Sequence, residues 1–96
     1  MDELQRTTDL LLNQVGHWTP ARWKGQVEPV YELAQRLADQ AADRTGTPRH
    51  PVPRVGDHAL PDQLRVIVSD FIAADPDPDA VADAVTQLTL VRQRLH

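Results

Sequence analysis

The chain has 96 residues, no cysteine and a formal net charge of -4. A chain of this length forms one domain, residues 1–96, and the lack of cysteine excludes disulfide bonds, thiolate metal sites and thiol redox chemistry. Its apolar runs are too short for a transmembrane helix and its acidic first residues do not resemble a signal peptide. The sequence therefore predicts a soluble, cytoplasmic protein.

The charges are unevenly distributed along the chain. Residues 17–54 carry a net charge of +2, whereas residues 55–96 carry -4. The basic surplus of residues 17–54 is small and partly offset by neighbouring acids. We therefore do not expect binding to nucleic acid.

The first predicted helix covers about residues 2–15. Asp2 can cap it, with Gln5 as the capping-box partner, and Gly16 stops it. Its apolar face is short and irregular, with Leu4, Leu11, Leu12 and Val15. Such a face leaves homodimerisation open as a way to complete the core.

A joint with the sequence HWTPARW, residues 17–23, holds both tryptophans, and we call it the Trp joint. Thr19 followed by proline is a typical helix start, which places Trp18 just before the cap and Trp23 at the fourth helical position. Side chains at these two positions meet in a hydrophobic staple, and Arg22 can stack on an indole face. Tryptophan and arginine are also typical of docking surfaces, so a staple and a docking patch both remain open.

The second predicted helix runs from Val27 to about Arg44 and has the clearest apolar stripe in the chain. Pro29 fits only in its first turn. The stripe consists of Val27, Val30, Tyr31, Ala34, Leu37, Ala38 and Ala41.

Two further helices are predicted in the second half of the chain. The third opens at Leu60, followed by proline and aspartate, and its inner face holds Leu64, Ile67, Val68 and Phe71. The fourth begins with Asp77 as its cap and Pro78 at the first position, and it ends with basic residues that suit the negative end of the helix.

Residues 45–59, with the sequence TGTPRHPVPRVGDHA, form a proline-rich connection between the second and third helices. Three prolines and two glycines prevent either helix from continuing. Pro48 and Pro51 with flanking arginines have the form of a polyproline II ligand. A stiff connector is the simpler interpretation, because the segment joins two closely spaced helices.

No pattern in the sequence indicates a catalytic, cofactor or metal site. The stretch DPDPDA from Asp75 begins like a calcium loop, but Ala80 and Thr86 stand where that loop needs glycine and glutamate. The histidines lack the spacing of a helix-borne metal site, and neither a phosphate loop nor a nucleophile elbow is present. We expect no enzymatic activity, no cofactor and no metal.

Three stretches, HWTPARW, QRLADQAADRTGTPRHPVPR and ALPDQLRVIVSDFIAA, resemble a group of short, uncharacterised all-helical proteins of high-GC bacteria. The resemblance covers about Val15 to Ala74. It implies a shared helical fold and no particular activity.

The sequence thus predicts an all-α domain resembling a small four-helix bundle, with the Trp joint and an ordered proline-rich connection over one face. The predicted function is a non-enzymatic protein-interaction or regulatory module with an unknown protein partner. One alternative is a DNA-binding regulator that holds phosphates with Arg44, Arg49 and Arg54. A second is a ligand-binding bundle or enzyme whose pocket forms only in the fold. The candidate interaction surface comprises Trp18, Arg22, Trp23, Arg49, His50 and Arg54.

Overall fold

The computed structural model describes residues 2–95, in which all regular secondary structure is helical. The predicted all-helical class is confirmed. No helix within these residues is both long and apolar enough to cross a membrane. The elements in chain order are α1 (Asp2–Val15), α2 (Pro20–Trp23), α3 (Val27–Thr45), a 3-10 turn η1 (Asp57–Ala59), α4 (Leu60–Ala73) and α5 (Pro78–Arg94).

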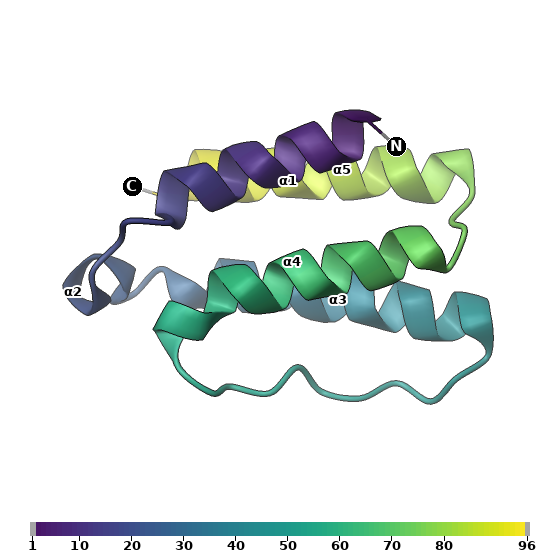
Figure 1. The fold of residues 1–96 in the computed structure, drawn as a ribbon, viewed down its shortest axis with the longest axis horizontal. Helices are drawn as coiled ribbons and strands as arrows, with labels where there is room; N and C mark the ends of the chain where they lie inside the picture. The colour runs from purple at the N-terminus through teal and green to yellow at the C-terminus, as the bar shows by residue number, and fades with distance from the viewer. Residues whose placement is uncertain (1, 96) are drawn as a thin grey trace.

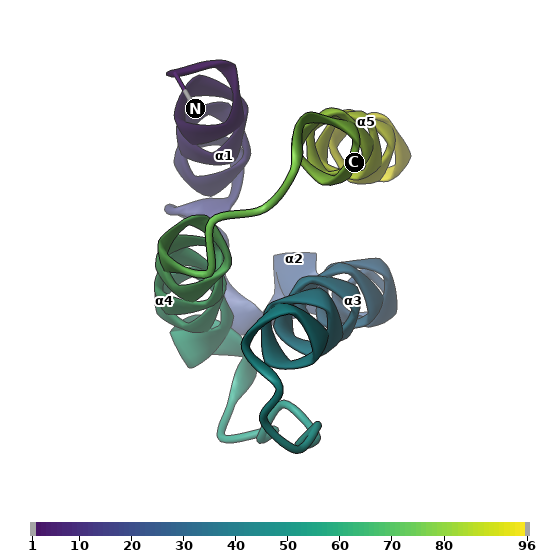
Figure 2. The same cartoon turned by 90° about the vertical axis from the view of Figure 1, so that its right-hand side faces the viewer.

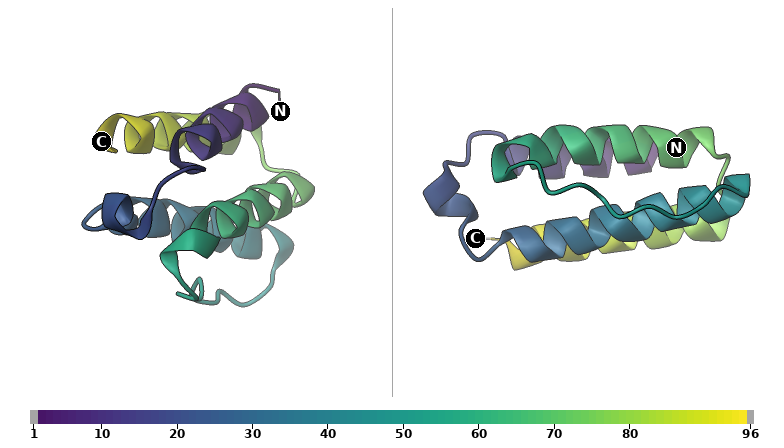
Figure 3. Two further views of the ribbon diagram at one scale, coloured as in Figure 1. Left: turned by 60° about the vertical axis from the view of Figure 1, so that its left-hand side comes forward. Right: turned by 90° about the horizontal axis from the view of Figure 1, so that it is seen from below.

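The four long helices pack in two layers (Figures 1 and 2). In one layer α1 and α5 lie side by side and parallel, and in the other α3 and α4 do the same in the opposite direction. Because α3 and α4 are parallel, the chain between them must return along the whole length of the layer. The predicted proline-rich connection is shorter than residues 45–59, because Thr45 belongs to α3 and Asp57–Ala59 form η1. Residues 46–56, which we call the connection from here on, make this return along the outer side of α3 and α4 (Figure 3).

The length and composition of the connection suit this return path. The 19 residues of α3 span about 28 Å at 1.5 Å per residue. Eleven residues in an extended, polyproline-like conformation span about 34 Å, so the connection reaches back with little slack. Its prolines favour that extended conformation, whereas a flexible linker would have to lose entropy to adopt it.

A single core lies between the two layers, and all four long helices contribute leucines or larger side chains to it. On α1, Thr7 and Thr8 are also buried, and the hydroxyl of Thr8 donates a hydrogen bond to the carbonyl of Leu4 at 2.8 Å. The two threonines fill the gap between Leu4 and Leu11, so the inner face of α1 is continuous over the length of the helix. The largest fully buried side chains are Trp23, Phe71, Leu4, Leu11, Leu37, Leu60, Leu64 and Leu88.

Local sequence signals explain where most helices begin and end. Asp77 caps α5 as predicted, because its Oδ1 accepts a hydrogen bond from the Ala80 amide at 2.8 Å. At the end of α3, Gly46 is left-handed with φ 73°, and the Thr47 amide bonds back to the Ala42 carbonyl at 2.9 Å. The predicted cap at Asp2 is wrong, since Asp2 is already the first residue of α1.

Candidate functional site

The Trp joint closes one end of the molecule, where α2 turns the chain from one layer into the other (Figure 1). The rings of Trp18 and Trp23 meet edge to face, with centroids 4.9 Å apart. Thr19 caps α2 by accepting a hydrogen bond from the Arg22 amide at 3.3 Å. Trp23 is only 2% exposed, whereas Trp18 is half-buried beneath the Arg22 guanidinium, 5.0 Å from its ring centroid. Of the three residues of the Trp joint that belong to the predicted interaction surface, Trp18 and Arg22 therefore remain accessible to a partner and Trp23 does not.

Arg54 joins the connection to the first turns of α3. Its guanidinium donates two hydrogen bonds to the carboxylate of Glu28, at 2.6 and 2.9 Å, and lies 4.1 Å from the centroid of the Tyr31 ring. The hydrogen bonds from Arg54 hold the pKa of the Glu28 carboxyl below its ordinary value of 4.5. Arg54 is thus engaged within the protein.

Arg49 makes the equivalent attachment near the end of α3. Two of its guanidinium nitrogens donate hydrogen bonds to the carboxylate of Asp43, at 2.9 and 2.5 Å, and a third lies 3.8 Å from Asp39. The hydrogen bonds from Arg49 hold the pKa of the Asp43 carboxyl below its ordinary value of 3.8. Both arginines of the connection are therefore paired with acids of the helix that precedes it.

Two glutamines hold the backbone of the connection between these ion pairs. The side-chain amide of Gln35 donates to the His50 carbonyl at 3.0 Å, and its oxygen accepts from the Val52 amide at 2.8 Å. From α4, Gln63 donates to the Pro53 carbonyl at 2.6 Å. An extended segment has no hydrogen bonds of its own, so these side chains supply partners that a sheet or helix would otherwise provide.

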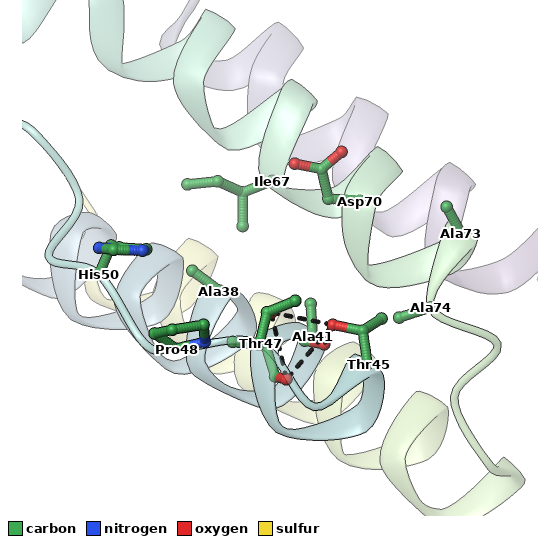
Figure 4. Close-up of a pocket in the computed structure, with 11 residues that line it drawn as sticks. Ala38, Ala41, Thr45, Thr47, Pro48, His50, Ile67, Asp70, Ala73 and Ala74 are labelled. Atoms are coloured by element: carbon green, nitrogen blue, oxygen red, sulfur yellow. Dashed lines mark hydrogen bonds between the residues drawn. The ribbon is translucent and has the colours of Figure 1, made fainter.

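A groove lies between α3, α4 and the connection, and it consists of two hollows of about 420 and 450 Å³. His50, Ala38 and Ile67 line both hollows, so the two hollows adjoin at these three residues. Figure 4 shows the first hollow, with Ile67 on the α4 side extending toward the α3 side, and with the Asp70 carboxylate at the rim and directed away from the alanines of α3. We call this feature the α3–α4 groove, and its other lining residues include Ala41, Ala42, Thr45, Pro48, Pro51, Val52, Pro53, Asp62, Gln63, Val66, Ala73 and Ala74.

The groove exists because small side chains face one another across it. Ala38, Ala41 and Ala42 project from α3, and Ala73 lies opposite at the end of α4. A methyl group leaves space that a leucine in the same position would fill. The sequence pattern placed Ala38 and Ala41 in the apolar stripe of this helix, but both are only partly buried and lie at the groove.

The groove is apolar at its floor and acidic along its α4 side. Asp62 and Asp70 both line it, and Val66 between them is 59% exposed. Among the described residues, no lysine or arginine lines either hollow. The side of the groove formed by α4 can therefore attract a positive charge while its floor accepts an apolar side chain.

The six residues of the predicted interaction surface lie in two segments. Trp18, Arg22 and Trp23 belong to the Trp joint, and the other three belong to the connection, where only His50 lines the groove. None of the α4 residues of the groove was predicted as part of a binding surface, and Ile67, predicted on the inner face of its helix, is only half-buried and lines both hollows. The available signal was a spacing of four, because Asp62, Val66 and Asp70 share one helix face and the middle position is apolar.

Within residues 2–95, no three histidine, aspartate or glutamate side chains are placed to hold a metal ion.

No protein-family model matches the chain, and no curated protein or solved structure is detectably similar to it. The shared fold expected from the resemblance to proteins of high-GC bacteria therefore stays a prediction.

Proposed function

We propose that the protein is a non-enzymatic interaction module and that the α3–α4 groove binds an apolar segment of a partner protein. The observation that carries this proposal is the exposed side chain of Val66 at one of two adjoining hollows that the protein's own side chains leave unfilled. Surface hollows with apolar walls favour binding because a partner's side chain gains contact there and loses water.

The attachment of the connection supports the same proposal. The Arg49 and Arg54 ion pairs and the Gln35 hydrogen bonds fix this wall of the groove before any partner arrives. Because this wall is already ordered in the free protein, binding does not include the loss of entropy needed to order it, and the affinity is higher. In this proposal the fold is a four-helix bundle with one long crossover, and the Trp joint is a staple that stabilises one end.

The DNA-binding alternative has less support. Arg49 and Arg54 would each have to leave a carboxylate that they already contact with two hydrogen bonds before either could bind a phosphate. Arg44 is exposed, but one arginine gives little phosphate affinity.

Photo-crosslinking from a single position tests the proposed function. A photoreactive amino acid replaces Val66 in the groove, and in a matched variant it replaces Leu10, which is also exposed but lies on α1. In the cells that make this protein, we expect a discrete adduct with another protein from position 66 and none from position 10. Adducts that are the same from both positions, or none from position 66, would show that the groove is not the binding site.

A further inference from the structure

We propose that the segment bound by the α3–α4 groove is a cationic amphipathic helix, in which two basic side chains pair with Asp62 and Asp70 and an apolar side chain between them contacts Val66. This inference rests on the proposed function and adds the chemistry of the partner. It follows from the charges, the spacing and the shape of the groove.

The carboxylates of Asp62 and Asp70 on α4 form no ion pair with another described residue of the protein, unlike most acids of the neighbouring helix α3. On α3, Glu28, Asp39 and Asp43 are paired with the arginines of the connection. Within residues 2–95, neither Asp62 nor Asp70 has an ion-pair partner. Since no lysine or arginine among the described residues lines the hollows, these two negative charges have no permanently charged basic neighbour along the groove.

The spacing of these carboxylates matches the repeat of a helix. Asp62 and Asp70 are eight residues apart on α4, which corresponds to about 12 Å along its axis, and Val66 lies midway. A partner helix lying along α4 presents residues seven or eight apart on one face at about 10 to 12 Å, with an apolar residue between them. Lysine or arginine at those two positions can reach both carboxylates at once.

The apolar parts of the groove explain why a helix fits better than a charged extended peptide. The two hollows lie in a row on either side of His50, so successive turns of one helix can each place a side chain in a hollow. A neutral apolar helix would fill the same hollows but would remove water from the two carboxylates without compensation. An acidic segment would in addition be repelled by them.

Titration of the ¹⁵N-labelled protein with two synthetic peptides tests this inference. The first is a helical peptide of about 16 residues, because shorter helices are marginal in water. It carries lysines seven residues apart with leucines between them, and the second peptide replaces those lysines with glutamates. We expect the lysine peptide alone to shift the amide signals of Val66, Ile67, His50 and Ala38.

Two charge variants provide the specific readout. The double variant D62N/D70N is expected to weaken binding of the lysine peptide about five-fold, the effect of losing two exposed ion pairs. The control D2N/D79N removes the same charge from exposed positions in the first turns of α1 and α5 and is expected to leave the affinity unchanged. All four substituted positions are exposed, so both variants are expected to fold.

Several results would overturn the inference. Equal binding of the glutamate peptide, or equal weakening by D2N/D79N, would show that the two groove carboxylates do not select the partner. Signals of the groove that change on dilution without peptide would identify a second copy of this chain as the occupant. If no peptide binds while crosslinking from position 66 succeeds, the cationic helix is wrong but the proposed function stands; if both fail, both are wrong.

Discussion

Gln35 is the residue on which the backbone of the connection depends most directly. Its amide group joins two backbone groups of the connection, the His50 carbonyl and the Val52 amide, to α3. Replacing it with alanine leaves the Val52 amide without this partner in a partly buried place, whereas the exposed His50 carbonyl remains accessible to water. We expect Q35A to lower the free energy of unfolding by about 1 to 3 kcal/mol.

Urea denaturation followed by circular dichroism measures this change. The matched control is Q93A, which removes a glutamine from an exposed position of α5 and is expected to alter the free energy of unfolding by less than about 0.5 kcal/mol. Equal effects of the two substitutions would mean that the Gln35 hydrogen bonds contribute nothing to stability.

The two tryptophans are expected to differ in their exposure to solvent. In W18F, the remaining Trp23 is buried in the core and should emit at short wavelength with little quenching by acrylamide. In W23F, the remaining Trp18 is half-buried under Arg22 and should be quenched more readily. Similar quenching of the two variants would contradict the burial of Trp23 seen in the structure.

At the scale of the elements, the connection is held to α3 by two carboxylates whose pKa values are lowered by arginine. Glu28 and Asp43 are more acidic in the folded protein than their ordinary values of 4.5 and 3.8. Their contribution to stability is therefore complete above those values and is lost as the pH falls through the lower values of the folded state. We expect the connection to loosen in acid before the long helices unfold.

The amide signals of His50 and Val52, followed by NMR from pH 7 to pH 3, measure this loosening. Signals of α5, which carries neither carboxylate, serve as the internal reference. In the variant E28Q/D43N the connection is expected to be loosened already at pH 7 and to change little with pH. A wild-type connection whose signals change only when α5 also unfolds would contradict the expectation.

Helix positions could be predicted from the sequence, whereas the attachment of the connection could not. Thr19 and Asp77 start helices through bonds to residues three positions away, so the chemistry is local and visible in the sequence. Glu28 and Arg54 are 26 residues apart, and no periodicity relates them. Their pairing follows only from the parallel arrangement of α3 and α4, which brings the connection back along α3.

The α3–α4 groove could not be predicted from the sequence for a related reason. Ala38 and Ala41 fit the apolar stripe of their helix, and alanine at such a position is compatible with either close packing or an unfilled hollow. Which of the two occurs depends on the size of the side chains opposite, and these come from α4 and the connection. The apolar pattern of one helix contains no information on its neighbours.

At the scale of the whole molecule, both layers share one core, so they are expected to unfold together. Leu11 of α1 and Leu64 of α4 are both fully buried, although they belong to different layers. Replacing either with alanine should lower the free energy of unfolding by about 2 to 5 kcal/mol, a large part of the total for a domain of this size. Both variants should unfold in one cooperative step.

Urea unfolding of L11A and L64A, followed in parallel by tryptophan fluorescence and circular dichroism, tests this cooperativity. Fluorescence reports on the end of the molecule that holds the Trp joint, and circular dichroism reports on all helices. We expect the two curves to coincide for each variant. A separate early transition in L11A would mean that the layer of α1 and α5 is an independent unit.

The proposed function depends on a groove whose outer wall is fixed in the free protein. The most direct test is the backbone {¹H}-¹⁵N NOE of residues 46–56, which contain several non-proline amides, compared with those of α3 and α4. We expect values close to those of the helices, because ion pairs and glutamine hydrogen bonds attach the connection along its length. Low values, typical of a linker moving on the nanosecond timescale, would contradict a preformed groove and the binding mode that depends on it.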